Sequence, residues 1–227
     1  MLVDVIRILP PEDLEPLRRC ASQLAAYHGI VLGSVAAAES LISVMDDGDR
    51  FEGSVFCVGE KTLVRIKDSP ELRRRLGDDL VVARPSTAEG LVEAVHAALP
   101  PSRRILFPHA LEGRSHVQAA LRELGYQVDD PVAYRIGRSE AWSVEQARSL
   151  DGLDAFWFFS GEALRAFLDV VPDAASRLQS ARIFVMGPAG LAKAEALGVR
   201  VDGVADEPSL AGLTESWYRV MGEGSRP

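Results

Sequence analysis

Part of this chain occurs twice, and this internal repeat limits its possible folds more than any other feature. Ile30–Leu41 resembles Phe156–Leu168: each reads as an apolar strand, a serine at its end and then a helix. The same order of motifs continues in two further pairs of segments, Val55–Ile66 with Ile183–Ala194 and Arg84–Val92 with Glu207–Thr214. Three landmarks in one order at nearly constant spacing predict two similar α/β halves. Ligands often bind where two such domains meet, so we expect a cleft between them.

Length and composition are typical of a globular protein. The 227 residues are 47% apolar and 26% charged, enough for one large domain or two small ones. The longest apolar runs, such as Ala155–Phe159, have the length of a strand, so no membrane span is expected. The N-terminus lacks the pattern of a signal peptide. Cys20 and Cys57 are not in a metal or redox spacing, which favours a cytoplasmic location with reduced thiols.

The charge pattern argues against some partners. A formal charge of −8 is unfavourable for binding nucleic acid, which needs a basic face. Arg73–Arg75 is the only basic run, and because Asp78 and Asp79 follow it we interpret it as a solvated helix end. Motifs for zinc, nucleoside triphosphates and dinucleotides are absent from the sequence, so we expect no metal and no cofactor.

Hydrophobic periodicity predicts alternating strands and helices. The predicted strands are Val3–Ile8, Gly29–Leu32, Ser54–Val58, Asp79–Ala83, Arg104–Phe107, Gln127–Ile136, Ala155–Phe159, Arg182–Met186 and Val199–Val204. The predicted helices are Leu14–Ala26, Val35–Met45, Glu60–Ile66, Thr87–Ala98, Ser115–Leu124, Val144–Leu150, Glu162–Val170, Leu191–Leu197 and Leu210–Met221. This alternation predicts parallel sheets covered on both faces, with any site at the carboxyl ends of the strands.

The two halves are unequal. The first contains one more unit, the strand ILFP, the helix SHVQAALRELG and the strand YQVDDPVAYRI, which has no counterpart in the second. The opening VDVIRI matches the end of that unit, VDDPVAYRI. We therefore expect the second half to lack a leading strand–helix unit of about 30 residues. Unpaired strand edges would make this half less stable than the first, or cause self-association.

Several strings resemble one family: VGEKTLVRI, ILFPHALEGRSHVQAALRELGYQVDDPVAYRI, DAFWFFSGEALRAFL and VMGPAGLAKAEALGVRVDGVADEPSLAGL. Together they resemble uroporphyrinogen-III synthase over nearly the whole chain. The resemblance implies two flavodoxin-like parallel-sheet domains joined by a two-stranded antiparallel linker. It places linker strands at residues 1–8 and 131–137, the first α/β domain at 9–130, and the second, without its leading strand–helix unit, at 138–227.

The implied reaction uses neither metal nor cofactor. Linear hydroxymethylbilane loses its hydroxyl, its last pyrrole ring is inverted through a spiro intermediate, and the macrocycle closes to uroporphyrinogen III in tetrapyrrole (haem) biosynthesis. Unassisted closure gives the other isomer, so positioning decides the product. The substrate carries many carboxylates, which suit the N–H groups and positive dipole ends of helix N-termini. No nucleic acid or membrane partner is implied.

The resemblance assigns roles to particular residues. Tyr134, in VAYRI, matches the tyrosine that aids departure of the hydroxyl as a proton donor; alternatively its hydroxyl only meets water on an amphipathic linker strand. Ser34 and Ser160 match substrate-binding serines at strand-to-helix turns. Both also fit simple helix N-caps, which is compatible with contacting an anion.

The remaining substrate-binding candidates lie at the other turns: Gly59, Thr62, Pro108, His109, Arg114, Gly187 and Pro188. The glycines permit close backbone approach but also merely permit a turn, and His109 and Arg114 also fit a solvated loop. Ala189 and Gly190 stand where the family commonly has hydroxyl residues. Two functions therefore compete, an active synthase and a catalytically inactive module that binds a tetrapyrrole or a protein partner. A third possible function, a two-domain sensor of small anions, is supported by no sequence motif beyond the expected fold.

Overall fold

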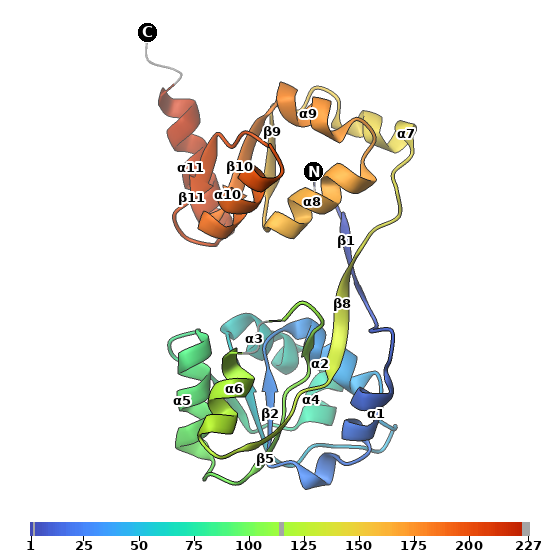
Figure 1. Cartoon of the computed structure of the whole chain (residues 1–227), viewed down its shortest axis with the longest axis vertical. Helices are drawn as coiled ribbons and strands as arrows, with labels where there is room; N and C mark the ends of the chain where they lie inside the picture. The colour runs from blue at the N-terminus through green and yellow to red at the C-terminus, as the bar shows by residue number, and fades with distance from the viewer. Residues whose placement is uncertain (2, 114–115, 224–227) are drawn as a thin grey trace. The chain divides into compact units, whose positions relative to one another are not determined.

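The computed structural model describes residues 1, 3–113 and 116–223, and it shows a mixed α/β fold with parallel sheets (Figure 1). The chain divides into two compact units. Unit 1 comprises Met1–Arg7 and Gly137–Pro227, and unit 2 comprises Ile8–Ile136. No helix in the described residues combines the length and the apolar composition needed to cross a membrane.

Unit 2 contains a five-stranded parallel sheet in the order β4-β3-β2-β5-β7. Its strands are β2 (Gly29–Leu32), β3 (Ser54–Cys57), β4 (Leu80–Val82), β5 (Arg104–Leu106) and β7 (Gln127–Asp129). Numbered along the chain, the strands lie in the order 3-2-1-4-5. Flavodoxin-like sheets have the order 2-1-3-4-5, so the flavodoxin-like expectation is corrected to the other doubly wound order. The reason is the path of the chain: it adds β3 and then β4 on one side of β2, and then adds β5 and β7 on the other side of β2.

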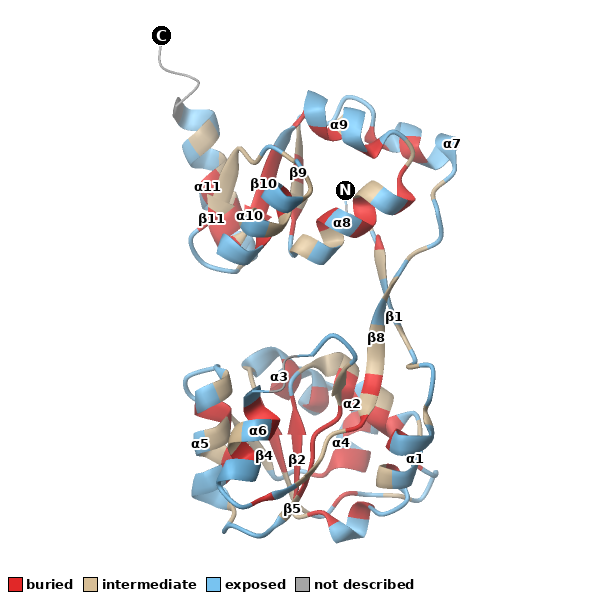
Figure 2. Ribbon diagram, in the orientation of Figure 1, coloured by how far each residue is buried: buried red, intermediate tan, exposed pale blue. Residues whose placement is uncertain are grey.

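Burial on both faces explains the near-continuous apolar strands β2 and β3, whose buried residues are red in Figure 2. Successive side chains point to opposite faces. Ile30 and Leu32 join the core cluster with α1 (Glu15–Ala21), η1 (Leu24–Ala26), α2 (Val35–Ile42), α3 (Glu60–Asp68) and α4 (Pro70–Leu76). Val31 joins the cluster with α5 (Ala88–Ala98) and α6 (His116–Glu123) on the opposite face.

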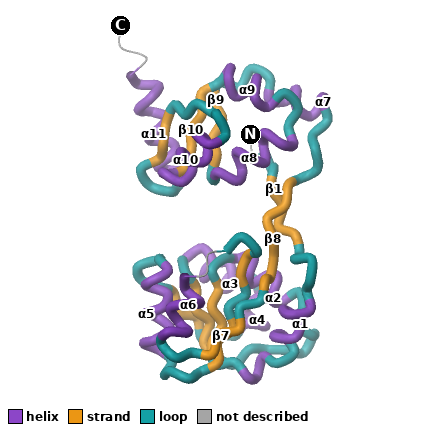
Figure 3. Tube along the Cα trace, viewed as in Figure 1, coloured by secondary structure: helices purple, strands orange, loops and turns teal. Residues whose placement is uncertain are grey.

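Unit 1 contains a smaller parallel sheet, of three strands in the order β11-β10-β9 (Figure 3). The strands are β9 (Ala155–Phe158), β10 (Arg182–Met186) and β11 (Gly203–Ala205). The helices are α7 (Val144–Ala147), η2 (Arg148–Leu150), α8 (Gly161–Val170), α9 (Ala174–Ser180), α10 (Gly187–Ala196) and α11 (Leu210–Glu223). Phe156 and Phe158 pack with Phe167 of α8, at centroid distances of 5.3 and 5.5 Å. The opposite face packs Phe184 with Leu213 of α11.

The internal repeat is confirmed in backbone geometry. Ser34 (φ −159°, ψ 162°) and Ser160 (φ −156°, ψ 157°) have almost the same conformation. Each caps the helix that follows by accepting a hydrogen bond from a backbone N–H three residues on, Ala37 or Ala163, at 3.1 Å. The units β2–α2 and β9–α8 therefore share the same turn from strand to serine to helix.

A second equivalent pair lies at the start of α5 and of α11. Thr87 caps Gly90 N–H at 3.1 Å, and Ser209 caps Gly212 N–H at 3.0 Å. A Cβ on Gly90 would lie 2.2 Å from the carbonyl oxygen of Pro85, and one on Gly212 would lie 2.4 Å from that of Glu207. Pro85 therefore corresponds to Glu207 in the structure, although the sequence pattern alone would align Pro85 with Pro208.

A third sheet includes β1 (Ile6–Leu9) and β8 (Val132–Arg138), the two strands that contain the unit boundaries at residues 7–8 and 136–137. It has the order β1-β8-β6, with β6 at His109–Ala110. Strands β6 and β8 are parallel, with His109 opposite Val132 and Ala110 opposite Tyr134. The short β6 follows β5 closely, which brings β8 beside the carboxyl end of the main sheet of unit 2.

Several elements differ from the sequence-based expectations. The helices α4 and α9 were not predicted, α10 begins earlier, at Gly187, and β11 is shorter, at Gly203–Ala205. The expectation that Arg75 is solvated is wrong. Only 4% of this residue is exposed, because it lies on the same face of α4 as the buried Leu72 and Leu76. Its guanidinium donates to the carbonyl oxygen of Asp46.

Unit 1 has fewer strands than unit 2, as the unequal halves of the sequence predicted. Strand β9 pairs only with β10 in the part of the chain that the structure describes. An apolar pocket of about 500 Å³ lies beside it, lined by residues that include Val3, Val5, Phe156, Phe158 and Phe167. The expected absence of a leading strand–helix unit stays a prediction.

Candidate active site

The sheet of unit 2 has one point where its topology reverses, between β2 and β5. In open α/β sheets, ligands bind outside the carboxyl ends of the strands at such a point. Ser34 stands just after the end of β2. Pro108 and His109 follow β5, and β6 pairs with β8, which carries Tyr134. The topology thus gathers four candidate residues at one edge of the sheet.

Ser34 and Tyr134 are in direct contact there. The Ser34 Oγ and the Tyr134 Oη lie 2.9 Å apart, although the residues are 100 positions apart in the chain. Both side chains are partly buried. The backbone of Tyr134 is held by β6, because the Leu111 N–H donates to its carbonyl oxygen at 2.8 Å. Its ring packs against the core cluster around α2. The hydroxyl of Tyr134 is therefore held in place beside the N-terminus of α2.

His109 and Pro108 are bound into the fold. The His109 Nδ1 lies 2.7 Å from the carbonyl oxygen of Ala110, and its Nε2 lies 2.9 Å from that of Asp130. Pro108 is buried. His109 therefore ties β6 to the segment between β7 and β8, and its contact with a substrate carboxylate stays a prediction. Arg114 lies outside the described residues.

Gly59 and Thr62 belong to the turn after β3. Gly59 is the N-cap of α3, and its carbonyl oxygen accepts from the Thr62 N–H at 3.2 Å. Only 5% of Thr62 is exposed, so its side chain offers little surface to a ligand in this conformation. The Ser86 Oγ lies 3.9 Å from the position of a Cβ on Gly59. Ser86 was not among the candidates, although it lies in the repeated string RPSTAEGLV.

The candidates of unit 1 lie at the carboxyl ends of β9 and β10. Ser160 is exposed and caps α8. Gly187 begins α10 with a φ of +70°, a conformation that favours glycine, and the exposed Pro188 follows it. Lys193, which sequence reasoning missed, covers Gly161 with its aliphatic chain, and its Nζ lies 2.8 Å from Glu162 Oε1. A cation therefore stands beside the first turn of α8.

Comparison with known families shows which family the whole chain belongs to. The family model for uroporphyrinogen-III synthase HemD matches residues 1–215. The chain belongs to the uroporphyrinogen-III synthase family. A search of curated proteins finds no match to the sequence.

Two solved structures of the synthase family share the fold. Uroporphyrinogen-III synthetase from Helicobacter pylori 26695 is 15% identical, with a TM-score of 0.64 over 98% of this chain and 91% of its own. A mutant uroporphyrinogen III synthase from the extremely thermophilic bacterium Thermus thermophilus is also 15% identical, with a TM-score of 0.55 over 98% and 89%. At this identity the likeness concerns the fold alone.

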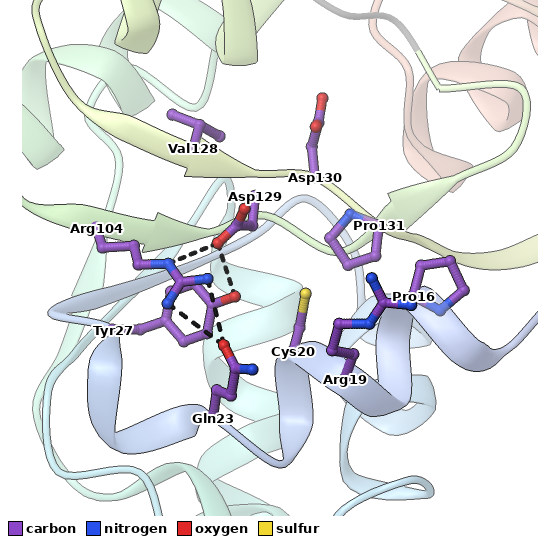
Figure 4. Close-up of a pocket in the computed structure, with 10 residues that line it drawn as sticks. All are labelled: Pro16, Arg19, Cys20, Gln23, Tyr27, Arg104, Val128, Asp129, Asp130 and Pro131. Atoms are coloured by element: carbon purple, nitrogen blue, oxygen red, sulfur yellow. Dashed lines mark hydrogen bonds and ion pairs between the residues drawn. The ribbon is translucent and has the colours of Figure 1, made fainter.

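One further pocket of this synthase-family chain is lined by side chains that bond to one another. It measures about 440 Å³ and is shown in Figure 4. The Asp129 carboxylate accepts from the Tyr27 Oη at 2.8 Å and from the Arg104 Nε at 2.7 Å, and the guanidinium lies 4.6 Å from the centre of the Tyr27 ring. Burial raises the pKa of Cys20, so its thiol stays protonated. This network joins Tyr27, directly after η1, to Arg104 of β5 and Asp129 of β7.

Proposed function

We propose that this chain is a uroporphyrinogen-III synthase, a cofactor-independent lyase that closes hydroxymethylbilane to uroporphyrinogen III with inversion of the last pyrrole ring. The observation that carries the proposal is the Ser34–Tyr134 contact at the reversal point of the sheet, in a chain that belongs to this family. Positioned side chains at such a point are what a reaction decided by substrate orientation requires.

Tyr134 acts as the proton donor in this proposal. The C–O bond of the hydroxymethyl group breaks and its electron pair goes to oxygen. The Tyr134 proton goes to the same oxygen, so that water leaves and an azafulvene-type cation remains. Ring closure later releases a pyrrole proton, which restores the phenol. General acid assistance of this kind contributes about 10²–10⁴-fold to rate.

Helix N-termini hold the substrate carboxylates in this proposal. The turns at Ser34, Gly59, Ser160 and Gly187 each begin a helix at the carboxyl end of a parallel strand. Backbone N–H groups and the helix dipole favour anions at these places. Local donors matter because the whole chain carries a formal charge of −8, which by itself repels an anionic substrate.

The finer architecture also belongs to this proposal. Units 1 and 2 correspond to the two domains of the family, and β1 and β8 are the linker strands. The three-stranded sheet of unit 1 and the edge of β9, unpaired among the described residues, support completion of this sheet by a further strand–helix unit or by a second copy. The free thiols of Cys20 and Cys57 support a cytoplasmic location.

An inactive module that binds a tetrapyrrole or a protein is the second candidate. It is favoured by Ala189 and Gly190, which give the first turn of α10 no hydroxyl. Activity separates the two candidates directly.

The test is a coupled assay of the purified chain. Hydroxymethylbilane is supplied by its synthase, and the oxidised products are separated into isomers I and III. We expect isomer III to dominate with the wild-type protein. Tyr134→Phe should lower kcat by about 10²-fold or more. The matched control is Tyr218→Phe, since Tyr218 is 64% exposed on α11. Isomer I alone, from protein that is folded by circular dichroism, would reject the synthase in favour of the inactive module.

A further inference from the structure

Among the described residues, the Ser34 hydroxyl has two hydrogen-bonding neighbours, and the number of bonds that a hydroxyl can make decides its role toward each. A serine hydroxyl has one proton to donate and two lone pairs. One lone pair accepts the hydrogen bond from the Ala37 N–H at 3.1 Å, which caps α2. The remaining neighbour is the Tyr134 Oη at 2.9 Å. The proton of Ser34 is therefore available to Tyr134.

Either oxygen of the pair can be the donor, and the two arrangements have opposite consequences. If Tyr134 donates to Ser34, the phenol proton is directed at the protein. If Ser34 donates to Tyr134, the phenol proton is directed away from Ser34 and can reach a substrate. Acceptance from Ala37 at the positive end of the α2 dipole favours the second arrangement, because it polarises the Ser34 O–H as a donor.

We infer that Ser34 is a positioning residue that acts through Tyr134: its O–H donates to the Tyr134 Oη, turns the phenol proton toward the leaving hydroxyl and stabilises the phenolate that forms. The inference rests on the proposed function and extends it. As the proton moves from Tyr134 to the leaving oxygen, negative charge develops on the Oη. The neutral hydrogen bond from Ser34 then becomes charge-assisted, so it is stronger in the transition state than in the ground state.

The rest of the fold keeps this pair together. Strand β8 carries Tyr134 and is held by β6, and the neighbouring Ala133 is 1% exposed in the core cluster that also contains Ala37 and Ala38 of α2. Ser160, the equivalent serine of unit 1, has the same cap but is exposed. The phenol contact therefore distinguishes Ser34 from an ordinary N-cap.

A double-mutant cycle with Ser34→Ala and Tyr134→Phe tests the inference. Ser34→Ala should lower kcat by about 10–100-fold with little change in KM, the usual effect of removing one hydrogen bond to a charged group. In the Tyr134→Phe background the same change should cost almost nothing, since the phenol through which Ser34 acts is gone. Ser34→Thr, which keeps the hydroxyl, should restore kcat to within about 3-fold of wild type; Thr87 shows that threonine can cap a helix in this fold.

Two variants separate this role from helix capping. Ser69→Ala removes the equivalent cap of α4, whose hydroxyl accepts from the Leu72 N–H at 3.3 Å, and should leave kcat unchanged. Ser34→Gly removes the hydroxyl but keeps a residue that caps helices well, so it replaces Ser34→Ala if that variant does not fold.

The outcomes are distinct. Equal losses of kcat in the wild-type and Tyr134→Phe backgrounds would show that Ser34 contacts the substrate by itself, which overturns the inference. An unchanged kcat in a folded Ser34→Ala or Ser34→Gly protein would overturn it as well. If wild-type protein makes no isomer III, the proposed function fails. The hydrogen bond between Ser34 and Tyr134 can still be tested by a measurement that does not depend on activity. In protein labelled with ¹³C at tyrosine Cζ, Ser34→Ala should shift the Tyr134 resonance while Ser69→Ala does not. An unmoved resonance would refute the bond.

Discussion

Replacing Gly90 by alanine should destabilise this protein, although glycine-to-alanine changes within helices usually stabilise by about 1 kcal/mol. The new Cβ would lie 2.2 Å from the carbonyl oxygen of Pro85 and 3.1 Å from two more of its backbone atoms. Because these are backbone atoms, the start of α5 must move, which also weakens the Thr87 cap. Overpacking costs about 1–3 kcal/mol and a lost cap about 1 kcal/mol. The net loss should be about 1–3 kcal/mol.

The internal repeat extends this prediction to the other unit. Gly212→Ala brings its Cβ within 2.4 Å of the Glu207 carbonyl oxygen and should cost a similar amount. The two losses should add, since the sites lie in different units. Gly222→Ala on α11 is the control: a Cβ there meets nothing within 4 Å, so stability should be unchanged or slightly raised.

Urea unfolding followed by circular dichroism measures these changes, with hydrogen exchange to assign them to a unit. If Gly90→Ala raised stability as Gly222→Ala does, the close approach of Pro85 to α5 would be refuted. If Gly90→Ala were destabilising and Gly212→Ala were not, the structural equivalence of the two turns would be refuted instead.

Two other predictions concern pH and local stability. Burial raises the pKa of Cys57 to about 11, whereas an unfolded thiol ionises near 9.0, so the unfolded state loses its proton first and stability should fall by about 2–3 kcal/mol between these pH values. Cys57→Ala should reduce that fall in urea titrations at pH values of about 8.5 and 10.5; an identical fall would contradict the burial of the thiol. Hydrogen exchange should show weaker protection in unit 1 than in unit 2, because three strands bury less than five and β9 pairs on one side only in the described residues. Equal protection of both units in a monomer would count against this.

Local features of the chain were predictable because their signals lie within a few residues. The buried strand Gly29–Leu32 was predicted with its observed bounds, since four apolar or small residues stand between turn signals. The capping roles of Ser34 and Ser160 follow from their place before amphipathic helices. The short α4 and α9 were missed, because helices of seven residues show too little periodicity to recognise.

The candidate site was only partly predictable for the same reason. Ser34 and Tyr134 could be named separately from the family resemblance, but nothing in the string around either residue indicates that the two hydroxyls meet. Their contact depends on strand order and on the pairing of β6 with β8, which are set by packing across 100 residues of chain. Ser86 and Lys193 were missed because their neighbours come from other turns.

The alternation of strands and helices, the repeat and the family could be predicted from the amino-acid sequence, since periodicity and motifs are carried by contiguous residues. The strand order of unit 2, the burial of Arg75, the backbone contacts of His109 and the contact of Ser34 with Tyr134 became visible only in the folded chain. Each of these depends on which distant segments the chain packs together. Many pairings satisfy the same local pattern, and the burial of both faces of the sheet selects one of them.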